Sequence, residues 1–136
     1  MTKVVTVKRR ALAANEERAE RLRARFAASG TLVANLISSP GSGKTSLLEA
    51  TVRALDDELT TAVIEGDVAT ENDADRIRAL GVPAHQILTG GACHLDARLV
   101  ETGIEEGGLP EVDILFIENV GNLICPTTYD LGEDFK

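Results

Sequence analysis

The stretch TLVANLISSPGSGKTSLLEATVRAL (residues 31–55) joins two ordered runs through a loop of serine, proline and glycine. Residues 31–37 are short, β-prone and poor in polar side chains, which is typical of a buried parallel strand. The run that starts at Lys44 has the apolar spacing of a helix. Between them, SSPGSGKTS matches the phosphate-loop pattern G-x-x-x-x-G-K-[ST], except that Ser38 replaces the first glycine.

This loop predicts a site for nucleotide phosphates. In such loops the backbone N–H groups point inward, and the following helix N-terminus adds positive potential. Gly41 and Gly43 permit close approach of the backbone, Lys44 reaches the β- and γ-phosphates, and the Thr45 hydroxyl is a Mg²⁺ ligand. An ordinary turn is the alternative, and the strand before and the helix after the loop disfavour it. We assign nucleotide binding to Ser39, Gly41, Ser42, Gly43, Lys44, Thr45 and Ser46.

The strand–helix alternation continues along the chain. Further strands are predicted at residues 60–67, at the HQIL run and at residues 112–118, and helices at 71–80 and from near residues 93–95 onward. This pattern predicts an α/β fold of the P-loop NTPase type, with a mostly parallel sheet and helices on both faces. We divide the chain into a helical segment, 1–30, whose helix covers 10–29 and stops at Gly30, and a P-loop domain, 31–136.

Composition excludes several classes of function. The chain has 136 residues and a net charge of −8, without a basic patch outside the N-terminal helix, so nucleic acid is not an expected partner. No apolar run approaches the ~18 residues of a membrane span. Two cysteines without an export signal indicate a reduced, cytoplasmic protein.

Two carboxylates are predicted at the ends of neighbouring strands. Glu118 follows a run of apolar residues, and burial in the strand interior would be costly, so we expect it at the carboxyl edge near the phosphate loop. There it would help to hold Mg²⁺, whereas alone it would read as a solvent-facing carboxylate. Asp67 ends another strand and is the second candidate, a switch residue near Mg²⁺ or the attacking water. Asp73 fits better as an ordinary acid near a helix start.

A cysteine–histidine group is a candidate metal site. Cys93, His94 and Cys125 follow predicted strands and are expected in loops at the same edge. Thiolate and imidazole suit Zn²⁺ or Ni²⁺, but the spacing is not that of a closed four-ligand zinc site. Small buried cysteines and a histidine at a helix start are the alternative reading. His85, in a short apolar strand, fits a structural role better.

The segments SSPGSGKTSLLE, VIEGDVATENDADRI, TGGACHLDARLV and LFIENVGNLICPTTYDLGE resemble the nickel-insertion GTPases of hydrogenase maturation, the HypB family. The resemblance runs from about residue 35 to the last residue. It implies a P-loop GTPase that uses GTP and Mg²⁺, forms a homodimer on GTP binding, and couples slow hydrolysis to metal transfer. It also implies a Ni²⁺ or Zn²⁺ site at Cys93, His94 and Cys125, catalytic roles for Lys44, Asp67 and Glu118, and two partners, a small nickel metallochaperone and the hydrogenase large subunit.

Two departures qualify this resemblance. The sequence has no cysteine-rich or histidine-rich N-terminal stretch, and no [NT]-K-x-D segment to read guanine, so guanine specificity is implied by the resemblance only. We expect a chain truncated at its C-terminus, with an incomplete sheet, marginal stability and weak nucleotide binding. The alternatives are a metal-binding or dimerisation module without turnover, and a urease-accessory-type nickel GTPase, which is disfavoured because Cys93 and His94 are adjacent.

Overall fold

The computed structural model describes residues 2–38, 44–55, 57–67, 72–89, 94–121 and 125–136; the side chains at positions 2–6, 8, 44, 67, 72, 73 and 125 lie outside this description. The elements follow one another as α1 (Thr2–Ser29), β1 (Leu32–Leu36), α2 (Lys44–Leu55), β2 (Thr61–Asp67), α3 (Asn72–Arg78), β3 (Ala84–Leu88), α4 (Ala97–Glu106), β4 (Ile114–Glu118) and a short 3-10 turn (Cys125–Thr127).

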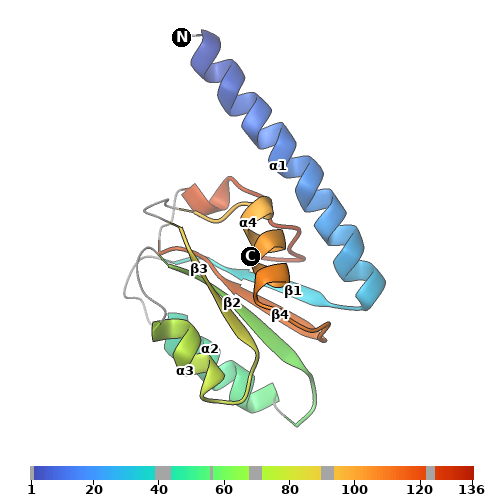
Figure 1. Cartoon of the computed structure of the whole chain (residues 1–136), viewed down its shortest axis with the longest axis vertical. Helices are drawn as coiled ribbons and strands as arrows, with labels where there is room; N and C mark the ends of the chain where they lie inside the picture. The colour runs from blue at the N-terminus through green and yellow to red at the C-terminus, as the bar shows by residue number, and fades with distance from the viewer. Residues whose placement is uncertain (1, 39–43, 56, 68–71, 90–93, 122–124) are drawn as a thin grey trace.

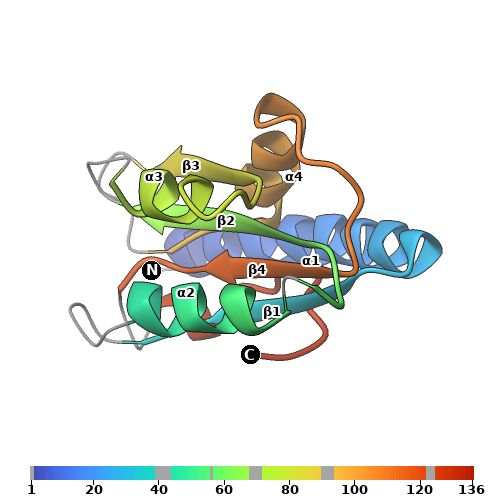
Figure 2. The same ribbon diagram turned by 90° about the horizontal axis from the view of Figure 1, so that it is seen from below.

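The four strands form one parallel sheet in the order β1-β4-β2-β3. Helices α2 and α3 cover one face, and α4 with the C-terminal half of α1 covers the other, while the N-terminal end of α1 projects away from the sheet (Figures 1 and 2). The predicted α/β fold with helices on both faces is therefore confirmed. Strand β4, which occupies a central position, pairs on one side with β1 and on the other with β2.

Each face of the sheet has its own apolar core. Because side chains alternate along a strand, Leu115 and Ile117 of β4 face α1 and α4, whereas Phe116 faces α2 and α3. Leu22 of α1 belongs to the first cluster and Leu48 of α2 to the second, and both are about 1% exposed. These two layers fix the sheet between the helices and leave its carboxyl edge to the loops.

Two helices differ from their predicted bounds. Helix α1 begins at Thr2 instead of near residue 10, and this added N-terminal part projects away from the sheet (Figure 1). It ends as predicted at Gly30, which has φ of 69°, while the Thr31 N–H donates to Phe26 O at 2.9 Å. Helix α4 was predicted to begin near residues 93–95 but begins at Ala97, because the Asp96 side chain caps it by accepting the Leu99 N–H at 2.8 Å.

The chain after β4 returns to α1 and then to β1. Phe135 forms a parallel bridge with Ala34, and the Asn35 N–H donates to Phe135 O at 3.0 Å. The last residues thus lie beside the edge of β1 that β4 does not use. Within the part of the chain described here, no helix is long and apolar enough to cross a membrane.

Candidate functional site

The carboxyl ends of the parallel strands bring the predicted acidic residues to one edge. Glu118 is the last residue of β4 and lies in register with Leu36 of β1, the strand that leads into the phosphate loop. On its other side Glu118 is in register with Glu65 of β2, two positions before Asp67 at the end of that strand. The order β1-β4-β2 therefore places Glu118 between the strands that carry the other candidates, at the carboxyl edge that the sequence predicted.

Thr45 and Glu118 are in direct contact. The Thr45 hydroxyl donates to Glu118 Oε1 at 2.8 Å, and the two residues are 8% and 4% exposed. Thr45 is held there because α2 begins at Lys44 and packs on this face of the sheet through Leu48. The reading of Glu118 as a solvent-facing carboxylate is therefore wrong, and the expected position near the phosphate loop is confirmed.

The second oxygen of this carboxylate fits a cation. Among the described residues, Glu118 Oε2 has no hydrogen-bond partner, although it is buried. A buried carboxylate oxygen is costly unless it is paired or bound to a metal. A threonine hydroxyl and a carboxylate are oxygen donors of the kind that Mg²⁺ prefers. Thr45 and Glu118 thus form a donor set that suits the predicted Mg²⁺.

The remaining phosphate-site residues are described only in part. Ser39, Gly41, Ser42 and Gly43 lie outside the described residues, as do the side chains of Lys44 and Asp67. Ser46 is exposed, and Arg76 Nη2 of α3 donates to its hydroxyl at 3.5 Å. The roles of these residues in nucleotide binding stay predictions.

The two segments that carry the candidate metal ligands meet through aromatic rings. The imidazole of His94 stacks on Tyr129, with ring centroids 3.9 Å apart and planes inclined by 10°. Tyr129 follows the turn that begins at Cys125. Stacking uses the face of the imidazole, whereas a metal binds to nitrogens in the plane of the ring. The contact therefore orients His94 beside the Cys125 segment in a way that is compatible with metal binding.

The thiol groups themselves are not described. Cys93 and the side chain of Cys125 lie outside the described residues, and among the residues that are described no three His, Cys, Asp or Glu side chains are grouped to hold a metal ion. His85 has the expected structural surroundings, since a Cβ added to Gly107 would come within 2.6 Å of its Cβ. The half-buried His85 thus packs against the end of α4.

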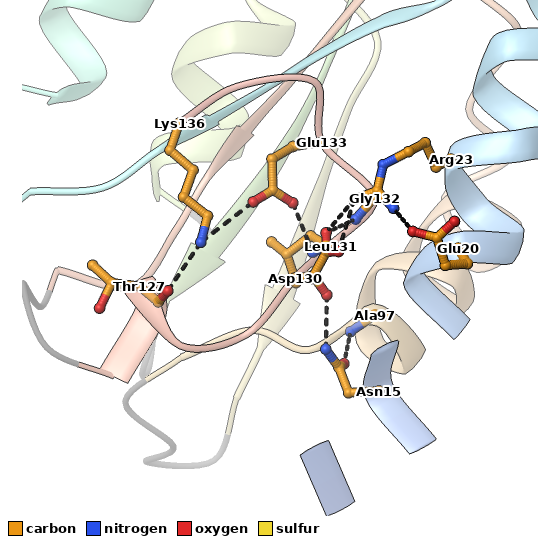
Figure 3. A network of polar contacts seen from close by, with 10 residues as sticks. All are labelled: Asn15, Glu20, Arg23, Ala97, Thr127, Asp130, Leu131, Gly132, Glu133 and Lys136. Atoms are coloured by element: carbon orange, nitrogen blue, oxygen red, sulfur yellow. Dashed lines mark hydrogen bonds and ion pairs between the residues drawn. The ribbon is translucent and has the colours of Figure 1, made fainter. Parts of the chain in front are cut away.

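Helix α1 holds both of these segments through one buried asparagine, shown in Figure 3. Asn15 Oδ1 accepts the N–H of Ala97 at 2.7 Å, and Asn15 Nδ2 donates to Asp130 O at 2.8 Å. Ala97 begins the helix that follows His94, and Asp130 follows Tyr129. Asn15 thereby holds the main chain just after each of the two segments, at Ala97 and at Asp130, although it is far from both in sequence.

A salt bridge supports the same arrangement. Arg23 Nη2 donates to both carboxylate oxygens of Asp130 at 2.7 Å each, and Arg23 also pairs with Glu20 (Figure 3). Burial raises the pKa of Asp130, but the hydrogen bonds from Arg23 and from the Gly132 N–H outweigh it, so that this pKa lies below its usual value. The loop after Tyr129 is thus fastened to α1 at adjacent points.

Sequence reasoning missed two buried asparagines. Asn15 and Asn119 are 6% and 1% exposed, and each bonds a main-chain N–H next to the candidate metal segment. The sequence offered a signal for Asn15, because it lies on the same stripe of α1 as Ala19, Leu22 and Phe26, all of which are buried. Polar residues on a buried stripe require hydrogen-bond partners.

The fold and the site define a class of protein. A parallel sheet whose edge strand leads through a glycine-rich loop into a helix, with a helix-start threonine bonded to a carboxylate of the neighbouring strand, is a P-loop nucleotide-binding domain. Residues 32–133 match the family described as "CobW/HypB/UreG, nucleotide-binding domain". The chain belongs to this family, and the resemblance noted in the sequence is confirmed.

Curated proteins with similar sequences are HypB maturation factors. The hydrogenase maturation factor HypB of Escherichia coli (strain K12) is 57% identical over 122 residues, which are 90% of this chain and 42% of the relative. The hydrogenase/urease maturation factor HypB of Helicobacter pylori (strain ATCC 700392 / 26695) is 46% identical over 134 residues, which are 96% of this chain and 54% of the relative. The chain spans about half the length of these curated relatives.

Solved structures agree with the fold. The crystal structure of HypB from Helicobacter pylori in complex with nickel matches with a TM-score of 0.80 and 47% identity, covering 88% of this chain and 57% of that one. The structure of the hydrogenase maturation factor HypB from Archaeoglobus fulgidus matches with a TM-score of 0.80 and 41% identity, covering 90% and 60% of the two chains.

Proposed function

We propose that this chain is the phosphate- and metal-handling part of a GTP-hydrolysing nickel metallochaperone, which assists insertion of nickel into the hydrogenase large subunit. The hydrogen bond from Thr45 to Glu118 carries the nucleotide half of this proposal, since it joins a helix-start hydroxyl to a buried carboxylate at the loop. The names of the relatives and the nickel complex of one of them support the metal half.

Hydrolysis would depend on charge and position. Backbone N–H groups of the loop and the Lys44 ammonium would hold the β- and γ-phosphates, while Thr45 and Glu118 would hold Mg²⁺. Bound there, Mg²⁺ supplies positive charge to the phosphate oxygens. The oxygen of an attacking water bonds to the γ-phosphorus, and the bond from that phosphorus to the β–γ bridging oxygen breaks with its electrons on GDP. The water proton passes to the released phosphate. Asp67, at the neighbouring strand end, would orient this water or the Mg²⁺ shell.

The metal ion is the cargo in this proposal. Cys93, His94 and Cys125 would bind Ni²⁺ or Zn²⁺ with at least one coordination position left open for transfer. The stacked rings of His94 and Tyr129 support this metal site, because they bring the segment of Cys93 and His94 beside the segment of Cys125. An open position suits an ion that is delivered onward.

The proposed partners follow from the family. GTP binding would favour a homodimer, a small nickel metallochaperone would exchange metal with the Cys93–His94 segment, and the hydrogenase large subunit would receive nickel in the cytoplasm. The relatives from Helicobacter are named for both hydrogenase and urease maturation, so urease is a second target protein to be tested as the recipient of nickel.

Two substitutions separate the functions. Lys44→Ala should abolish phosphate release from GTP and leave the metal stoichiometry unchanged, whereas Cys93→Ala should lower the stoichiometry and leave nucleotide binding intact. ATP in place of GTP tests the choice of base. Unchanged metal stoichiometry in both variants would contradict the metal proposal.

A metal-binding or dimerisation module without turnover is the second candidate. It predicts metal binding with no phosphate release from the unsubstituted chain. Among the residues that the structure describes, Glu118 Oε2 has no hydrogen-bond partner beside Thr45, which favours a cation at the nucleotide edge and thus the first candidate.

A further inference from the structure

Neighbouring residues at the end of β4 contact opposite sides of the sheet. Glu118 lies toward α2 and accepts the Thr45 hydroxyl at 2.8 Å. Asn119, the next residue, turns to the other side, where its Oδ1 accepts the N–H of Leu95 at 3.2 Å. Leu95 directly follows His94. One peptide unit thus connects the predicted Mg²⁺ edge with the predicted metal segment.

The side chain of Asn119 is held in a single orientation. It is 1% exposed, its Oδ1 also accepts the Val120 N–H at 2.9 Å, and its Nδ2 donates to Asn35 Oδ1 at 3.2 Å. Its own N–H donates to Leu36 O of β1 at 3.0 Å. Because every one of these partners is a fixed group of the sheet or of the adjoining segment, a movement of residues 118–119 changes the position of Leu95.

Leu95 also touches the strand that carries the second acidic candidate. It is fully buried, and a Cβ added to Gly66 of β2 would lie 3.0 Å from its Cδ1 and Cγ. Gly66 directly precedes Asp67. Leu95 is therefore bonded through its main chain to the end of β4 and packed through its side chain on the end of β2, which are the two strand ends predicted to respond to nucleotide.

We propose that Asn119 is a positioning residue that couples nucleotide occupancy at the Thr45–Glu118 edge to the position of His94 and Leu95. Binding of Mg²⁺ and nucleotide then changes the affinity of the His94 segment for metal, and metal changes the affinity for nucleotide by the same factor. The inference rests on the proposed function and adds the residue through which its two halves communicate.

The test measures this coupling directly. The affinity for Zn²⁺ or Ni²⁺, each added alone in competition with a chelator, is determined with and without Mg²⁺ and a non-hydrolysable GTP analogue. We expect the unsubstituted chain to show a ratio of affinities of about 5- to 150-fold, the usual range of coupling between sites. Asn119→Ala should bring this ratio close to one.

Asn35→Ala is the matched control. It breaks the same 3.2 Å hydrogen bond between the two asparagines and leaves Asn119 Oδ1 on the Leu95 N–H. A general loosening of the site would change the metal affinity by the same factor with and without Mg²⁺ and the GTP analogue. The ratio of these two affinities would then be unaltered. Asn35→Ala should therefore keep the ratio, and an equal loss in both variants would overturn the inference.

A measurement without substitution covers the case in which Asn119→Ala does not fold. The NMR shift of the Leu95 amide proton is followed in the unsubstituted chain as Mg²⁺ and the analogue are added. A change is expected, and an unaltered Leu95 amide at saturating analogue would overturn the inference. If nucleotide and metal both bind with no coupling, the inference fails and the proposed function stands; if neither binds, the proposed function itself fails.

Discussion

Replacing Asn15 by alanine tests how firmly α1 holds the two segments of the candidate metal site. The change removes the hydrogen bonds to the Ala97 N–H, at 2.7 Å, and to Asp130 O, at 2.8 Å, and touches no predicted ligand. It leaves the helix intact, because alanine favours helix more than asparagine does. The expected result is a loss of folding stability large enough to measure.

The size of the loss follows from the surroundings of each partner. Ala97 is fully buried, so its N–H is left without a partner at a cost of about 1–3 kcal/mol. Asp130 is partly exposed, and water can replace Asn15 at its carbonyl, so that bond contributes about 1 kcal/mol. Alanine has a higher helix propensity than asparagine, and this difference offsets roughly 0.5 kcal/mol of the loss. The net loss of unfolding free energy should be about 1.5–3.5 kcal/mol.

Urea unfolding followed by helical circular dichroism measures this loss. Arg18→Ala is the matched control, because Arg18 also joins α1 to α4, through Glu101 at 3.7 Å, but both side chains are about a third exposed or more. Such a surface pair contributes about 0–1 kcal/mol. Asn15→Asp keeps the acceptor for Ala97 but places a buried carboxylate against Asp130 O, so it should lose more than the ~1 kcal/mol of that one hydrogen bond. A loss for Asn15→Ala no greater than that for Arg18→Ala would refute the reasoning.

Three other outcomes are expected. Gly132→Ala should lower the melting temperature more than Gly81→Ala, because both glycines have φ near +80° but only at Gly132 would the new Cβ meet α1, at 2.9 Å from its backbone; equal effects would contradict the packing argument. Because the pKa of Asp130 is lower in the folded than in the unfolded state, its contribution to stability is complete above the unfolded pKa of about 3.9 and is lost as the pH falls through the folded pKa. Arg23→Ala should therefore flatten the slope of unfolding free energy against pH below about pH 4. An unchanged slope would show that Asp130 is not the group responsible. Thr45→Val should weaken Mg²⁺-dependent nucleotide binding about tenfold or more, whereas Thr45→Ser, which keeps the hydroxyl, should retain it; equal binding in titrations of the two variants would remove Thr45 from the site.

The sequence was sufficient for the parts of the fold that depend on local pattern. The apolar run before the loop and the helix from Lys44 were predicted within a residue or so, because periodicity and glycine position mark them directly. The position of Glu118 was predictable because burying a carboxylate inside a strand is costly, so a carboxylate after apolar residues is expected at the strand end with a partner. The start of α4 differs from the prediction because it is set by Asp96, whose side chain caps the helix, and not by the residues after the glycine pair.

The long-range hydrogen bonds were beyond local pattern. Asn15 bonds to residues 82 and 115 positions away, and Asn119 to residues 24 and 84 away. The buried stripe of α1 indicates that Asn15 needs a hydrogen-bond partner, but no local pattern identifies that partner, and Asn119 follows a strand without a comparable signal. Only the register of the sheet and the packing of α1 bring these groups together, and both depend on the whole fold.

The hydrogen bonds of Asn15 also determine which positions are free to vary. Both end on main-chain atoms, the N–H of residue 97 and the carbonyl of residue 130. Any residue except proline supplies that N–H, and any residue supplies that carbonyl. The support that α1 gives to the two segments therefore depends on side-chain identity at position 15, while the segments can exchange side chains around the candidate metal site and still be held in the same place.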